Sequence, residues 1–252
     1  MMRRLLLLAV LLLTPAPLLA QGRTFDGTND NLIAPDNSAS GLDTAQRSWS
    51  FWLTAPAPAV GSDAIFAAVT AAGGTEIHGI DVEPPASAGL RLMFYQTFST
   101  ATGVWASTDV SASTRHHVLV TYDRGATTND PVIYVDGTSL TLNEDSTPSG
   151  TTTTGDDTFK MGEYTGGSGD FTGTVQYLAV YSGLFDAAAR NRARWWGRPH
   201  GGAIIYHPFV TSKLADEGSA AETLTANGSV MAAFVTPVVR TGTWMLGEGV
   251  GW

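Results

Sequence analysis

HHVLVTYDRG, residues 116–125, has the alternating side-chain pattern that decides the fold class. Successive side chains of a strand point to opposite faces, so Val118, Val120 and Tyr122 share one face. The other face carries Leu119 between two polar residues and is itself partly apolar. The pattern therefore predicts a β-strand that is covered on both sides.

Similar short apolar runs, separated by Gly, Asp, Asn and Pro, recur along most of the chain. This organisation is typical of an all-β sandwich or barrel. PVIYVDG, residues 131–137, ends in an Asp-Gly pair that predicts a tight hairpin turn. One segment differs: Asp186 suits a helix N-cap and Gly197 a C-cap, so we expect one short helix near 187–196.

The first 20 residues, MMRRLLLLAVLLLTPAPLLA, combine a basic start at Arg3 and Arg4 with an apolar run and a small-residue end. This order is typical of a secretory signal peptide, so we assign residues 1–20 to one, cleaved near Ala20. The apolar run is shorter than the roughly 20 residues of a membrane span. We therefore expect a secreted protein, extracellular or periplasmic, with no membrane insertion after cleavage.

The remaining chain is acidic. Removing Arg3 and Arg4 from the 14 basic residues leaves 12 against 23 acidic ones, a net charge of −11. Such a surface repels phosphate groups, which argues against nucleic-acid partners. The chain has no Cys, so neither disulfides nor thiol chemistry contributes.

The last 50 residues differ from the rest in pattern. In residues 201–252, IIYHPFV and SVMAAFVTPVV read as strands around an acidic loop rich in small residues. A segment of about 50 residues is marginal as an independent core. We therefore expect a C-terminal β extension that completes the sandwich of residues 21–200, with a small second unit as the alternative.

Five motifs follow one another in an order that belongs to a known family. They are FDGTNDNLIAP (25–35), SWSFWLTA (48–55), HHVLVTYDRG, PVIYVDGTSL (131–140) and FKMGEYTGGSGDFTGTVQYLAVYSGLFDAAA (159–189). Together they resemble the laminin-G-like (LamG) family of concanavalin A-like lectin/glucanase domains. The resemblance runs from Phe25 to about Gly197, and implies a two-sheet antiparallel jelly-roll sandwich.

HGIDVEPP, residues 78–85, raises the question of catalysis. Asp81 and Glu83 would share one face of a strand, and two carboxylates are the minimal equipment for glycoside hydrolysis. The family 16 glycoside hydrolases, which resemble this domain, carry E-I-D-V-E, in which the first Glu is the nucleophile. Gly79 stands at that position, so we expect no catalytic residues and no enzyme.

The resemblance also implies one structural Ca²⁺ between the first loop and the closing strand. Asp26 and Asp30 would supply carboxylates, since Ca²⁺ prefers clustered oxygen ligands. Gln176 stands where the family has Asp, and a neutral amide still offers an oxygen but removes one charge. The alternative for Asp26 and Asp30 is turn capping.

Aromatic side chains are candidates for a sugar-binding platform. Tyr95 and Trp105 would lie along the concave face of the jelly roll, where exposed rings stack on sugar CH groups. The alternative is that they belong to the core. Trp49 and Trp52 are three residues apart on one strand, so they face opposite sides of its sheet, and one of them is expected in the core.

Taken together, the sequence predicts a secreted, non-catalytic jelly-roll domain that binds a glycan or another cell-surface polymer. One alternative is a structural or adhesive module, such as a phage-like assembly subunit, without glycan binding. A second is a glycoside hydrolase-like enzyme with a displaced active site. The identity of the ligand and the oligomeric state stay open.

Overall fold

A computed structural model describes residues 21–28, 30–34, 44–58, 61, 63–70, 76–153, 157–163, 169–196, 203–207, 225–227 and 231–234. The signal peptide predicted for residues 1–20 lies outside these ranges. Across the described ranges, no helix has the length and hydropathy needed to cross a membrane.

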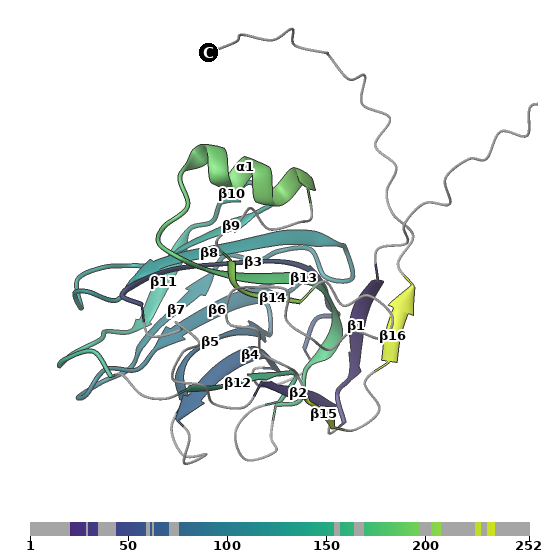
Figure 1. Cartoon of the computed structure of the whole chain (residues 1–252), viewed down its shortest axis with the longest axis horizontal. Coiled ribbons are helices and arrows are strands. Elements are labelled where there is room, and N and C mark those ends of the chain that lie inside the picture. Colours follow the sequence, from purple (N-terminus) through teal and green to yellow (C-terminus); the bar gives the residue numbers. More distant parts are fainter. Residues whose placement is uncertain are drawn as a thin grey trace, which may run out of the picture.

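The described residues form two antiparallel sheets and one helix (Figure 1). Sheet A has the order β10 (Thr138–Ser139), β9 (Val132–Val135), β8 (His116–Asp123), β3 (Gln46–Thr54), β13 (Thr172–Ser182), β1 (Gln21–Asp26) and β16 (Met231–Phe234), with β14 (Ala203–His207) also on β13. Sheet B has the order β11 (Leu142–Ser146), β7 (Gly103–Ser107), β6 (Arg91–Gln96), β5 (Glu76–Glu83), β4 (Asp63–Thr70), β12 (Asp157–Met161), β2 (Asn31–Ala34) and β15 (Thr225–Asn227). The predicted all-β jelly-roll sandwich is confirmed.

The core lies between the two sheets and follows the alternation of the strands. On β8, Val118, Val120 and Tyr122 are buried in it, as their shared face predicts. Leu119 on the other face is also buried, which confirms that this strand is covered on both sides. The cover on the outer face includes α1 (Ala187–Trp196), which lies above β9 and β10 (Figure 1).

The predicted turn and helix are both confirmed. Asp136 and Gly137 have φ values of 51° and 86°, the left-handed conformations that a tight hairpin between β9 and β10 requires. At the helix start, the Ala189 amide donates to Oδ1 of Asp186 at 2.7 Å, so Asp186 is the N-cap.

The run SLTLN, residues 139–143, reads as one strand in the sequence but is divided between the sheets. The Leu140 amide donates to the Ile133 carbonyl in sheet A, whereas the Thr141 carbonyl accepts from Thr108, next to β7 in sheet B. The chain therefore passes from one sheet to the other between these two residues.

The C-terminal strands add to both sheets. β14 pairs with β13 and β16 with β1 in sheet A, while β15 pairs with β2 in sheet B. The described segments 203–207, 225–227 and 231–234 thus share the hydrogen-bonded sheets of the N-terminal part of the chain.

A buried polar group connects the sheets through the core. Arg47 on β3 is fully buried, and its Nη1 lies 2.9 Å from Nδ1 of His78 on β5. Its Nη2 donates to Oε1 of Gln96 on β6 at 3.0 Å, and Gln96 donates in turn to the Ile77 carbonyl. Burial, and then repulsion from Arg47 and Arg124, holds the pKa of His78 well below its ordinary value, so the ring is neutral and can accept.

Replacing Arg47 by Ala should strongly destabilise the fold. The change leaves a cavity and removes the donor that His78 and Gln96 share, so we expect a loss of about 3–5 kcal/mol in the free energy of unfolding. Urea denaturation measures it. Arg91→Ala is the matched control: Arg91 pairs with Glu83 at the surface, and its loss should cost about 1 kcal/mol or less. Equal losses in the two variants would contradict the role of Arg47.

The neutral His78 should make stability depend on pH. Unfolding returns the ring to water, where its pKa is about 6.5, so below that pH the unfolded chain binds a proton that the folded chain does not. Stability should therefore fall as the pH drops from 6.5 towards 5, by up to about 1.4 kcal/mol per unit. Urea titrations of wild type and His78→Gln test this, since Gln keeps an acceptor for Arg47 but does not titrate. If the stability of His78→Gln depended on pH as that of wild type does, His78 would not be the cause of this dependence.

Candidate functional site

The hydrolase-like strand is β5, and its two carboxylates do not form an open pair. Asp81 is 0% exposed, while Glu83 accepts an ion pair from Arg91 at 2.8 Å. Gly79 pairs with Tyr95 on β6 and so occupies an interior position of the sheet. The sequence correctly placed Asp81 and Glu83 on one face, since Ile80 and Val82, which alternate with them along β5, belong to the core.

The predicted sugar platform does not form. Trp105 is 1% exposed and packs in the core against Phe94 and Tyr122, with its Nε1 donating to Asp130 at 3.0 Å. The prediction of an open Trp105 ring is wrong, because pairing opposite Phe94 turns Trp105 inward. Tyr95 lies on the other face of sheet B but is only 5% exposed, so its ring offers no open stacking surface.

The predicted calcium ligands are only partly brought together. The Asp26 amide donates to Oδ2 of Asp30, so these two residues share one turn. Gln176 does not join them: Asp26 pairs with Thr172, four residues away along β13, and Oε1 of Gln176 accepts from Arg115 at 2.7 Å. The expected three-residue set is therefore wrong in its third member.

Asp30 itself fits a cation ligand. Asp30 is 1% exposed, and no donor among the described residues reaches its Oδ1. A buried carboxylate oxygen without a donor is costly unless an ion or water satisfies it. Within the described ranges, no group of three or more acidic or His side chains converges on a metal position. Asp26 and Asp30 are thus suitable oxygen ligands, but two carboxylates alone do not complete a Ca²⁺ shell.

A different group of side chains meets on the outer face of sheet A. Strand register places Gln176 of β13, Trp52 of β3 and His117 of β8 in one row across three neighbouring strands. Arg115, just before β8, lays its guanidinium 3.9 Å from the centre of the Trp52 ring. We call Trp52, Arg115, His117 and Gln176 the Trp52 cluster.

Each member of the Trp52 cluster is held by another contact. Nε of Arg115 donates to Oε1 of Gln176 at 2.7 Å, which fixes the guanidinium plane over the indole. His117 meets the Trp52 ring edge-on at 5.3 Å, and its Nε2 lies 3.0 Å from Oγ of Ser50. Burial lowers the pKa of His117 to about 4, with Asp136 opposing and Arg194 and Arg115 adding to the shift. The ring is therefore a neutral hydrogen-bonding group at physiological pH.

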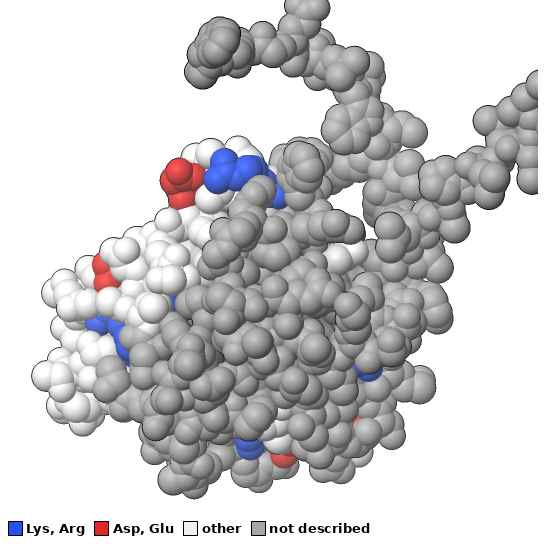
Figure 2. All heavy atoms as spheres, in the orientation of Figure 1, with Lys and Arg blue, Asp and Glu red and all other residues white. Residues whose placement is uncertain are grey.

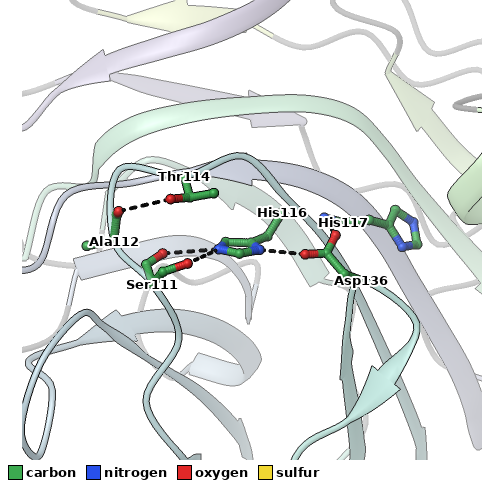
Figure 3. A network of polar contacts seen from close by, with 6 residues as sticks. All are labelled: Ser111, Ala112, Thr114, His116, His117 and Asp136. Carbon is green, nitrogen blue, oxygen red and sulfur yellow. Dashed lines mark hydrogen bonds and ion pairs between the residues drawn. The ribbon is translucent and has the colours of Figure 1, made fainter. Parts of the chain in front are cut away.

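A serine, a histidine and an aspartate line up beside this cluster. Nδ1 of His116 lies 2.7 Å from Oδ2 of Asp136, and its Nε2 lies 2.8 Å from Oγ of Ser111. Figure 3 shows the His116 ring between these two residues, while the His117 ring points away from them. The order of the contacts is that of a hydrolytic triad.

The surroundings of Nε2 distinguish this group from a hydrolytic triad. Nε2 of His116 lies 3.1 Å from the Ser111 carbonyl as well as 2.8 Å from Ser111 Oγ. In a hydrolytic triad, the corresponding nitrogen faces the serine Oγ alone, as its base.

The group instead anchors the loop before β8 to the β9–β10 turn. Asp136 accepts from His116 through Oδ2 and from the His117 amide through Oδ1. Burial alone would raise the pKa of Asp136, but these two hydrogen bonds outweigh it and hold the pKa below its ordinary value. Asp136 thus stays ionised, and its hydrogen bond with the His117 amide holds this member of the Trp52 cluster in place.

Sequence reasoning missed this cluster because its members come from separate strands. The three-residue spacing of Trp49 and Trp52 did predict opposite faces, and Trp49 is the buried one. Only the register of β3 against β8 and β13 reveals that Trp52 meets His117 and Gln176. The one local sign of the cluster in the sequence was Arg115, which directly precedes His116 and His117.

Comparisons with known proteins agree with this architecture. The laminin G-type model of the concanavalin A-like lectin/glucanases superfamily matches residues 26–189. No curated protein matches the chain. Among solved structures, the native heptameric SAP-like pentraxin of Limulus polyphemus has a TM-score of 0.61 at 12% identity, over 86% of this chain and 95% of the pentraxin chain.

A second similar structure is that of a protein from Bacteroides ovatus ATCC 8483 proposed to bind carbohydrate. It has a TM-score of 0.58 at 13% identity over 86% of this chain, which spans 60% of the length of that protein. At such identities the likeness concerns the fold alone. With the family match covering most of the two-sheet sandwich, the chain belongs to the concanavalin A-like lectin/glucanases superfamily.

Proposed function

We propose that this protein is a secreted, non-catalytic domain that binds a glycan, and that the Trp52 cluster is its binding site. The observation that carries the proposal is the Arg115 guanidinium held 3.9 Å from the centre of the half-buried Trp52 ring, beside His117 and Gln176. Sugar sites combine an aromatic ring with a few fixed polar groups. Trp52 supplies the ring and Arg115 the accessible polar group, while His117 and Gln176, each 2% exposed, hold them in place. Superfamily membership supports a binding role, and the basic, apolar first 20 residues support secretion.

The geometry of the cluster suits binding because its polar groups are already in place. The contacts of Arg115 with Trp52 and Gln176, and of His117 with Ser50, fix these side chains before a ligand arrives. Preorganised groups lose little conformational entropy on binding, which favours affinity.

The chemistry of β5 supports the absence of glycoside hydrolysis. A pair of accessible carboxylates is required, one as an acid and one as a base or nucleophile. Gly79 provides no side chain, Asp81 is fully buried and Glu83 is ion-paired with Arg91. In the Ser111–His116–Asp136 group, Nε2 of His116 faces the Ser111 carbonyl as well as Oγ, which is not the arrangement of a nucleophilic serine.

Replacing Trp52 by Ala should abolish glycan binding. Loss of the ring removes the stacking surface and the support of Arg115, so we expect at least a tenfold weaker Kd, about 1.4 kcal/mol. A glycan array identifies the best oligosaccharide, and titration calorimetry then compares the variants.

Leu184→Ala is the control for this experiment. Leu184 is 47% exposed and lies near Gly183, which pairs with Gln46 at the opposite end of β3 from Trp52. Trp52→Phe should give an intermediate Kd and guards against a folding defect. Wild-type protein that binds no glycan on the array would favour the structural or adhesive module instead.

We also propose that Ca²⁺ binds beside Asp26 and Asp30, where it would satisfy the donor-free Oδ1 of Asp30. A ligand at ten times its Kd stabilises by about 1.4 kcal/mol, so Ca²⁺ should raise the Tm by about 3–5 °C. Asp30→Asn should remove the shift, whereas Asp145→Asn, on the exposed strand β11, should keep it. A wild-type Tm indifferent to Ca²⁺ would discard the site.

A further inference from the structure

A row of arginines crosses the outer face of sheet A in an otherwise acidic protein. Arg190 and Arg194 are four residues apart on α1, so they lie on the same side of the helix. Figure 2 shows the basic side chains gathered over this helix. Arg115 of the Trp52 cluster belongs to the same face, while the chain as a whole has a net charge of −9.

Aromatic rings or turns hold each of these arginines against the sheet. The Arg190 guanidinium lies 4.5 Å from the centre of the Tyr134 ring on β9, and that of Arg115 lies 3.9 Å from the centre of the Trp52 ring. Arg194 crosses the β9–β10 turn, since a Cβ on Gly137 would come within 2.7 Å of its Nη1. Both Arg194 and Arg115 depress the pKa of His117, which lies next to Trp52 in the row.

Strand register gives the length of the row. Tyr134 pairs with Leu119 and Trp52 with His117, two residues apart on β8. With strands about 4.8 Å apart and about 3.4 Å per residue, the two aromatic rings are separated by roughly 12 Å. The row formed by Arg115, Arg194 and Arg190 is therefore long enough to contact several units of a polymer rather than one small group.

We propose that the glycan bound at the Trp52 cluster is acidic, and that Arg115, Arg194 and Arg190 bind carboxylate or sulfate groups along it. This rests on the proposed glycan-binding function and adds the class of ligand. A guanidinium stacked on a ring keeps its N–H edge fixed for a planar or tetrahedral anion. Nε of Arg115 is used by Gln176, and within the described part of the chain no acceptor engages its two terminal nitrogens. Asp136, which is near enough to Arg115 and Arg194 to interact with both charges, is also paired with His116.

Two matched pairs of polymers test the proposal. Polygalacturonate is compared with its methyl ester, and dextran sulfate with dextran, so that only the charge differs within a pair. The full chain should bind an acidic member at least about tenfold more tightly than its neutral partner. That preference should shrink between about 50 mM and 500 mM NaCl as salt screens the charges. Preference in the first pair alone identifies carboxylate, and in the second alone sulfate.

Variants on α1 localise the effect. Arg194→Ala and Arg115→Lys should each weaken acidic-glycan binding by about tenfold, with melting temperatures checked for folding. Arg192→Ala is the matched control: it removes the same charge from the same helix, two residues from Arg190 and so on the opposite side, and should bind as wild type.

The outcomes separate the two proposals. Equal binding of charged and neutral polymers overturns the acidic class while leaving glycan binding intact. An Arg192→Ala loss as large as that of Arg194→Ala overturns instead the assignment to Arg115, Arg194 and Arg190, because it indicates diffuse charge. Failure to bind any glycan, neutral or acidic, overturns the proposed function itself.

Discussion

The register of β3 between β8 and β13 is the constraint on which both the interior and the outer face of sheet A depend. It points Arg47, Trp49 and Phe51 inward and leaves Trp52 outside. Because side chains alternate with a period of two, a slip by one residue would exchange these faces. The hydrogen bonds from Arg47 to His78 and Gln96 resist that slip, since they connect β3 to partners in the opposite sheet. A buried polar contact thus specifies which residues the surface presents.

The sequence could predict what depends on local pattern. Alternation along residues 116–123 predicted a doubly covered strand, Asp136-Gly137 predicted a hairpin, and Asp186 predicted the helix start, because each is settled within a few residues. Side-chain positions that depend on pairing could not be predicted. Trp105 turns inward because of its register with Phe94, and Gln176 is engaged by an arginine 61 residues away. Such contacts follow from the tertiary arrangement, which one sequence does not encode in any local signal.

The charge distribution separates two kinds of recognition on one molecule. The net negative charge favours solubility and repels polyanions at long range. Arginines stacked on Trp52 and Tyr134 create a local exception, and the neutral His117 beneath them adds hydrogen bonding without further charge. A polyanion would therefore gain from short-range contacts only after approaching against a weak repulsion, which favours selectivity over rapid capture.

The pairing of β1 with β16 has a consequence for how the chain matures. Gln21 lies opposite Phe234, so β1 waits for a strand that is synthesised about 210 residues later. Strand β2 waits similarly for β15. Until then these strands present unpaired backbone groups, which invite association with other chains. Contacts this distant in sequence also close slowly. Completion of both sheets therefore waits until residue 234 has been synthesised, and the edges of β1 and β2 are open to other chains until then.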